Sequence, residues 1–132
     1  MTAAGFESAA VLGTADAACK RATDRILATK PKDFQPPTLA ASIEETLPEQ
    51  KRALGVLQGL RAKATKPGYA QFVKLEEQRY AQALKIVAAG KANKQPLFDQ
   101  LQAQDGELYA KGQPMALRLG FTVCGVSSPI GF

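Results

Sequence analysis

An all-α fold is predicted by the amino-acid composition, by the helical spacing of the apolar residues and by the positions of proline and glycine. The 132 residues include 23 alanines but only six valines and four isoleucines. Alanine is the strongest helix former, whereas β-branched residues favour strands. No Asn-Gly or Asp-Gly pair is flanked by alternating strand patterns. Breaks divide the chain into four amphipathic segments of about 20 residues, so we expect an antiparallel, up-and-down four-helix bundle.

A single domain is indicated by the length and the composition. The chain has 132 residues and a mass of 14.0 kDa, with 45% hydrophobic and 22% charged residues, which is enough apolar material for one core. Within the domain 1–132, we expect the core to span about residues 6–125 and residues 126–132 to form an apolar C-terminal extension. No stretch of about 18 consecutive apolar residues is present to span a membrane.

The first helix is expected over about residues 14–29, with Thr14 as its N-cap and Asp16 in its first turn. Residues 6–12 could extend this helix by a turn or two, although Gly13 argues against it because glycine has a low helix propensity. Apolar residues at steps of four, three and four define its inward face, which carries Ala15, Cys19, Ala22 and Ile26.

The second helix is expected from Thr38, its predicted cap, to about Ala64. Its apolar face consists of Ile43, Leu47, Leu54, Leu57, Leu60 and Ala64. Pro48 lies inside this pattern and has no amide hydrogen to donate. The helix should therefore kink near Pro48, or end and restart with Thr46 as a new cap.

The third helix has the most regular pattern, over about residues 69–89, and Gly90 should end it in the left-handed conformation. Its predicted inward face carries Tyr69, Val73, Glu76, Tyr80, Ala83, Leu84 and Val87. Glu76 occupies a position where leucine is expected. We interpret it as a side chain that reaches the bundle edge and pairs with a lysine or arginine. The alternative is an enclosed carboxylate that marks a binding site.

The fourth helix should begin at Pro96 and end at Gly120, with Phe121 folding back on the last turn. Its predicted apolar stripe consists of Leu97, Leu101, Gln104, Leu108, Met115 and Leu119. Pro114 removes one backbone hydrogen bond inside this helix, so we expect a second kink near residues 111–113.

The two cysteines, Cys19 and Cys124, are expected to form a disulfide. Cys19 lies on the inward face of the first helix, and Cys124 follows the glycine that ends the fourth. Because the first and fourth helices of an antiparallel bundle are neighbours, this bond would hold the C-terminal segment against the first helix. The other interpretation is two unrelated buried thiols in a cytosolic protein.

Short motifs near both ends of the chain resemble those of a group of bacterial proteins. The run ADAAC that ends at Cys19 and the run LGFTVCG around Cys124 are similar to a pattern in uncharacterised small exported proteins and lipoproteins of actinobacteria. The similarity covers approximately residues 6–125. It implies an extracytoplasmic helical domain with a disulfide between these two cysteines and no catalytic residue to transfer. The sequence departs from the pattern in residues 126–132 and shows no export leader.

Positive charge is concentrated in the middle of the chain. The whole chain has a net charge of +5, whereas residues 50–94 carry ten basic residues against Glu76 and Glu77, a net +8. The ten are Lys51, Arg52, Arg61, Lys63, Lys66, Lys74, Arg79, Lys85, Lys91 and Lys94. They could form a surface for an anionic partner, although solubilising lysines on exposed helix faces give the same pattern and are the simpler interpretation.

Residue patterns for catalysis or metal binding are missing from the sequence. The chain has no histidine, which is the commonest general base and metal ligand, and two distant cysteines cannot complete a tetrahedral metal site. No phosphate-binding glycine loop, dinucleotide fingerprint or Cys-x-x-Cys pair occurs. We therefore expect a protein that is not an enzyme and that holds no metal or cofactor.

These observations predict a non-enzymatic, extracytoplasmic protein of the cell envelope that acts as a binding or assembly module. Its partner would be an anionic envelope polymer or a second copy of the chain. The candidate contacts for assembly are Val126, Ile130 and Phe132 of the apolar tail, although packing of the tail on its own domain is the simpler expectation. The alternative is an intracellular, nucleic-acid-associated basic protein that uses the positive surface of residues 50–94.

Overall fold

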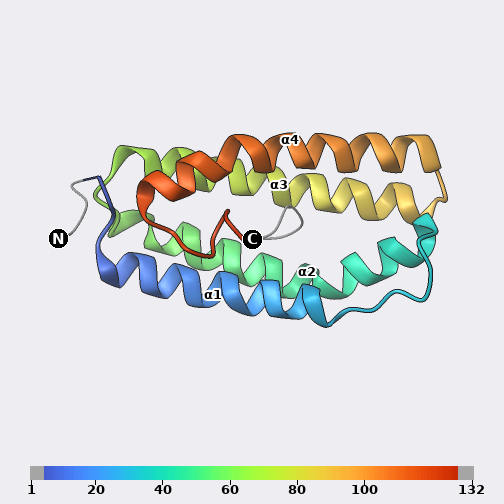
Figure 1. Ribbon diagram of the computed structural model, residues 1–132, viewed down its shortest axis with the longest axis horizontal. Coiled ribbons are helices and arrows are strands. Elements are labelled where there is room, and N and C mark those ends of the chain that lie inside the picture. Colours follow the sequence, from blue (N-terminus) through green and yellow to red (C-terminus); the bar gives the residue numbers. More distant parts are fainter. Residues whose placement is uncertain (1–4, 128–132) are drawn as a thin grey trace.

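The computed structural model describes residues 5–127 and is a four-helix bundle without strands in that range, which confirms the predicted fold class (Figure 1). The helices are α1 (Ala9–Ala28), α2 (Pro36–Gly59), α3 (Pro67–Lys91) and α4 (Gln95–Leu119), with a short 3₁₀ turn, η1 (Leu60–Ala62), after α2. Along the chain, each helix packs against the next one. Within the described residues, no helix is long and apolar enough to cross a membrane.

The helices begin earlier than expected because other residues start them. Ser8 caps α1, since its hydroxyl accepts a hydrogen bond from the Val11 N–H at 3.3 Å, so the predicted cap at Thr14 is wrong. Helices α2 and α3 begin at Pro36 and Pro67. Proline suits the first turn because its backbone angle is helical and its missing N–H has no partner to lose there.

Both internal prolines lie within continuous helices. Helix α2 runs through Pro48 and α4 runs through Pro114, and Figure 1 shows each helix bending along its course. The missing proline N–H explains these bends, because one hydrogen bond to the preceding turn is lost. Helix α2 does not restart at Thr46; the Thr46 hydroxyl instead donates to the Ile43 carbonyl at 2.6 Å within the helix.

The ends of α3 and α4 differ in the residue that takes the left-handed conformation. Gly120 ends α4 with a φ of 100°, as predicted, and Phe121 N–H donates to the carbonyl of Ala116 at 3.1 Å. Helix α3 continues through Gly90, and Asn93 takes the positive φ of 54° instead. Gly90 serves packing, because a β-carbon there would lie 2.5 Å from the β-carbon of Ala40 in α2.

The core follows the predicted faces of α1, α2 and most of α3 but not that of α4. Leu84 in α3 is 46% exposed, and in α4 Leu97 and Gln104 are exposed. The residues that α4 buries are Phe98, Asp105, Gly112, Ala116 and Leu119. Leu119 was predicted, whereas Phe98, Asp105 and Ala116 each lie one position after a predicted residue. A count of apolar residues misses this face because it includes a carboxylate and a glycine.

After α4 the chain turns back and lies between α1 and α4, as Figure 1 shows. We call residues 121–127 the returning segment. Helix α1 does not pack directly along α4; it packs on α2 and reaches α4 through the returning segment. The expectation that the first and fourth helices are direct neighbours is therefore wrong, because the returning segment lies between α1 and α4.

Candidate functional site

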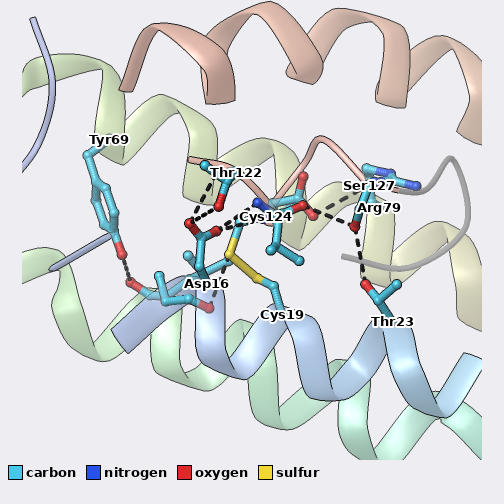
Figure 2. Close-up of a disulfide and its surroundings, with 12 residues drawn as sticks. Asp16, Cys19, Thr23, Tyr69, Arg79, Thr122, Cys124 and Ser127 are labelled. Carbon is cyan, nitrogen blue, oxygen red and sulfur yellow. Dashed lines mark hydrogen bonds and ion pairs between the residues drawn. A yellow bond between two sulfur atoms is a disulfide. The ribbon is translucent and has the colours of Figure 1, made fainter. Parts of the chain in front are cut away.

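Cys19 and Cys124 form the predicted disulfide. The bond joins residues that are 105 positions apart in sequence, and their Cα atoms lie 5.3 Å apart. Both residues are fully buried. Figure 2 shows the bond running from α1 to the returning segment. It therefore ties the end of the folded chain to the first helix.

Asp16 holds the returning segment one turn before Cys19 on the same face of α1. Its carboxylate accepts hydrogen bonds from the backbone N–H groups of Thr122, Val123 and Cys124 at 2.9–3.0 Å, and from the Thr122 hydroxyl at 3.0 Å (Figure 2). Hydrogen bonds to an ionised acceptor are stronger than neutral ones. The sequence gives only one hint of this role, namely the three-residue spacing that places Asp16 above Cys19 on the helix.

Phe121 anchors the returning segment in the aromatic part of the core. Its ring centre lies 5.2 Å from that of Phe72 and 6.3 Å from that of Tyr69. The Tyr69 hydroxyl donates to the Leu57 carbonyl at 2.6 Å, and burial together with the nearby charge of Glu7 raises the pKa of Tyr69 to about 12. Tyr69 therefore stays protonated and keeps this hydrogen bond at neutral pH.

The last described residues pack on their own domain. Val126 is half-buried against the core, and its carbonyl accepts a hydrogen bond from the Tyr109 hydroxyl of α4 at 2.8 Å. The hydroxyls of Ser127 and Thr23 lie 3.3 Å apart, which ties the segment to α1. Of the three predicted tail contacts, Val126 thus faces its own core, and Ile130 and Phe132 lie outside the described residues.

Arg79 and Asp105 form an enclosed ion pair between α3 and α4. Arg79 is 4% exposed, and its Nε and Nη2 donate to the two carboxylate oxygens of Asp105 at 3.1 and 3.2 Å. The guanidinium carbon also lies 5.4 Å from the ring centre of Tyr109. Arg79 was predicted as part of an exposed positive surface, and that prediction is wrong because its side chain points into the α3–α4 contact.

Glu76 is enclosed beside this pair, so the interpretation that it reaches the bundle edge is also wrong. It is 1% exposed, its Oε2 lies 4.0 Å from Arg79 Nη1, and that oxygen accepts no hydrogen bond from the described residues. Gly112 of α4 leaves room for the neighbouring Leu75 side chain, because a β-carbon there would lie 2.5 Å from Leu75 Cδ2. Burial raises the pKa of Glu76 to about 7; the Arg79 charge opposes this shift and the Asp105 charge adds to it. Glu76 can therefore gain or lose a proton near neutral pH.

Glu7 joins the N-terminal residues to the start of α3. Its carboxylate is buried and accepts hydrogen bonds from the backbone N–H groups of Thr65, at 2.9 and 3.1 Å, and of Lys66. Burial acts to raise the pKa of Glu7. Its hydrogen bonds with these amides and with that of Ser8 together have the larger, opposite effect, so the pKa lies below its ordinary value. The sequence carries no local signal for this contact because the partners are 58 and 59 residues apart.

The other predicted basic residues lie mainly at the surface. Lys66 is half-buried, and the exposed ones are Lys51, Arg52, Arg61, Lys63, Lys74, Lys85, Lys91 and Lys94. Two of these have acidic partners: Lys91 Nζ lies 2.5 Å from Glu44 Oε2, and Arg52 Nε lies 3.8 Å from Glu49 Oε2. The segment 50–94 is therefore a surface of mixed character, part of it neutralised by ion pairs.

Comparisons with known proteins identify no relative. No family model, curated protein sequence or solved structure matches the chain. Across residues 5–127, no group of three or more Cys, Asp or Glu residues is placed to hold a metal ion. The features that bear on function are the disulfide, the buried charges and the surface.

Proposed function

We propose that this protein is a non-enzymatic module of the cell envelope that works in an extracytoplasmic compartment and acts by binding or assembly. The observation that carries the proposal is the Cys19–Cys124 disulfide. Disulfides persist in oxidising compartments, whereas cytosolic thiols are kept reduced. Catalytic and regulatory disulfides are exposed to their partners, whereas this bond is fully buried. A structural role outside the cytoplasm accounts for both features.

The enclosed charged groups support a binding role over a catalytic one. Three carboxylates have structural partners: Asp105 holds Arg79, half-buried Asp16 holds the backbone of the returning segment, and Glu7 holds the start of α3. Glu76 is 1% exposed and lies beside Arg79. A catalytic acid or base must lie within hydrogen-bonding distance of a substrate. Groups that are enclosed and already bonded to the fold are poorly placed for that task, so the exposed surface is the better candidate for function.

The compartment is tested by the oxidation state of the protein in its native host. Free thiols would be alkylated before cell lysis, and the intact mass would be measured without reductant. We expect a mass that lacks two hydrogens and carries no alkyl group, because Cys19 and Cys124 are bonded to each other. Alkylation of both cysteines would contradict the proposal and favour a cytosolic protein.

The second candidate function is an intracellular, nucleic-acid-associated protein that uses the positive surface of residues 50–94. The exposure of eight of the ten predicted basic residues favours it. Phosphate contacts release counterions, so this function predicts an affinity for duplex DNA or RNA that falls steeply with salt. Free thiols in the host together with such binding would replace the first proposal by the second.

Assembly through the C-terminal tail is tested by truncation. Removing residues 128–132 leaves Val126 with its bond to Tyr109, whereas removing residues 126–132 also takes this contact away. If the tail joins copies of the chain, both truncations should lower the sedimentation coefficient to that of a monomer. Unchanged sedimentation of the shorter chains would contradict assembly through the tail.

A further inference from the structure

A row of three shallow depressions lies along the contact between α3 and α4. Their volumes are about 430, 250 and 340 Å³. The first two share Gln71 and Met115 and are therefore continuous, whereas the third lies nearer the other end of the two helices and shares no lining residue with them. Each has two basic residues in its lining: Lys66 and Arg118, then Lys74 and Lys111, then Lys85 and Lys94. We call this row the α3–α4 groove.

The α3–α4 groove is positive, and its exposed basic residues are not neutralised by acidic residues within the range 5–127. None of the residues that line the three depressions is acidic. Its five exposed basic residues form no ion pair with the described residues: Lys74, Lys85, Lys94, Lys111 and Arg118. Such a surface attracts anions more strongly than a surface of balanced charge.

The opposite side of the bundle has a different charge pattern. There, basic and acidic residues of α1 and α2 pair with each other, as Lys20 does with Asp24 at 2.8 Å and Arg25 with Glu45 at 3.7 Å. Charged residues that merely keep a helix soluble would be expected to include both signs on either side. The absence of acidic residues from the groove lining therefore points to an anionic partner on the α3–α4 side.

The dimensions and composition of the α3–α4 groove suit an extended polymer. Lys66 and Lys94 are 28 residues apart, which corresponds to about 40 Å at the helical rise of 1.5 Å per residue. Gln71 and Gln78 add neutral amides that can bind hydroxyl groups. No aromatic side chain lines the groove, although proteins that bind single-stranded nucleic acid use aromatic rings to stack on bases.

We infer that the α3–α4 groove binds a linear polymer of polyol phosphates, with the basic residues pairing with successive phosphates and the glutamine amides binding the hydroxyls. This inference rests on the proposed extracytoplasmic function, since it names the partner of that module. It changes the predicted surface in two ways. Lys111 and Arg118 join it from outside residues 50–94, whereas Lys51, Arg52, Arg61, Lys63 and Lys91 are not among the residues that line it.

The test is binding of fluorescent poly(glycerol phosphate) to the oxidised full chain, measured by anisotropy. The groove variant carries Lys74→Gln, Lys85→Gln and Lys111→Gln. The control variant carries Lys20→Gln, Lys30→Gln and Lys51→Gln, which removes the same net charge at exposed positions outside the groove. Circular dichroism checks that both variants fold.

We expect the groove variant to bind at least about tenfold more weakly than the natural protein, and the control to bind within about twofold of it. With about five phosphate contacts, the natural affinity should fall roughly 100-fold between about 50 and 200 mM salt. Equal weakening of both variants, or no binding by the oxidised natural protein, would overturn the groove assignment.

Two further probes test the chemistry of the partner. Single-stranded DNA of matched charge and vesicles containing anionic phospholipid should both bind more weakly than poly(glycerol phosphate). Tighter binding to the DNA would overturn the inference in favour of nucleic acid, and tighter binding to the vesicles would overturn it in favour of a lipid surface. Because the disulfide is measured separately in the host, an intact disulfide with no polymer binding refutes this inference alone.

Discussion

The two sides of α4 are held to the rest of the bundle in different ways. Toward α1, the contact passes through the returning segment, which is fastened by the disulfide and by the carboxylate of Asp16. Toward α3, the helices touch directly and enclose the Arg79–Asp105 pair. A short segment buries little apolar surface of its own, so it depends on specific bonds. Two packed helices bury enough apolar surface to hold together, so their contact can also enclose a charged pair.

The largest expected effect comes from breaking the contact between α3 and α4. Replacing Arg79 by alanine leaves the carboxylates of Asp105 and Glu76 enclosed without their cation, which should cost about 3–5 kcal/mol of unfolding free energy. Urea unfolding at pH 7 measures it. The control is Arg25→Ala, whose pair with Glu45 is exposed and contributes at most about 1 kcal/mol. Equal stability of the two variants would show that the enclosed pair is not a strong contact.

Removing the disulfide should have the next largest effect. The double variant Cys19→Ser, Cys124→Ser should lose about 2–4 kcal/mol, because the bond closes a loop of 105 residues. Its helical circular dichroism should persist, since the four helices do not depend on the returning segment for their own hydrogen bonds. The rate of amide hydrogen exchange should increase more in residues 121–127 than in α3. Uniformly faster exchange along the whole chain would contradict this local role.

Replacing Asp16 by alanine should have a somewhat smaller effect on the same contact. The change removes the acceptor for three backbone amides and should cost about 1.5–3 kcal/mol. Asp24→Ala is the matched control, because that carboxylate forms only an exposed pair with Lys20. Asp16 and the disulfide hold one segment, so their losses in the combined variant should not add. Simple additivity would show that they act independently.

The smallest effect is the dependence of stability on pH through Glu76. Its folded pKa of about 7 lies above the ordinary 4.5, so the folded state binds the proton more tightly than the unfolded state. The unfolding free energy should therefore fall as the pH rises from about 4.5 to about 7, by roughly 1–3 kcal/mol. The groups that face this carboxylate, Arg79 and Asp105, are already included in that pKa.

Glu76→Gln should remove the fall in stability between about pH 4.5 and about pH 7, because glutamine does not titrate. Glu7 acts in the opposite direction: its lowered pKa gives stability above about pH 4.5 that is lost as the pH falls through its folded pKa. Urea unfolding at different pH values therefore distinguishes the contributions of the two carboxylates to the unfolding free energy. A Glu76→Gln protein that keeps the fall would assign it to another group.

The sequence by itself determined the helices, most of their breaks and the pairing of the cysteines. Helix formation depends on hydrogen bonds between residues four apart and on apolar residues at helical spacing, both of which are local. The turn at Gly120 is local for the same reason, since the conformation belongs to one residue. With just two cysteines in the chain, the topology of a bundle predicted the bond between Cys19 and Cys124, with two free thiols as the alternative.

The tertiary structure alone decided the features that join residues far apart in sequence. It placed the returning segment between α1 and α4, enclosed Glu76 and Arg79, shifted most of the buried face of α4 by one position and brought Lys111 beside Lys74. Each of these depends on which faces meet when the helices pack. A carboxylate or an arginine is buried only where its partner lies on another helix, as Asp105 does for Arg79, and no local pattern in the sequence records that partner.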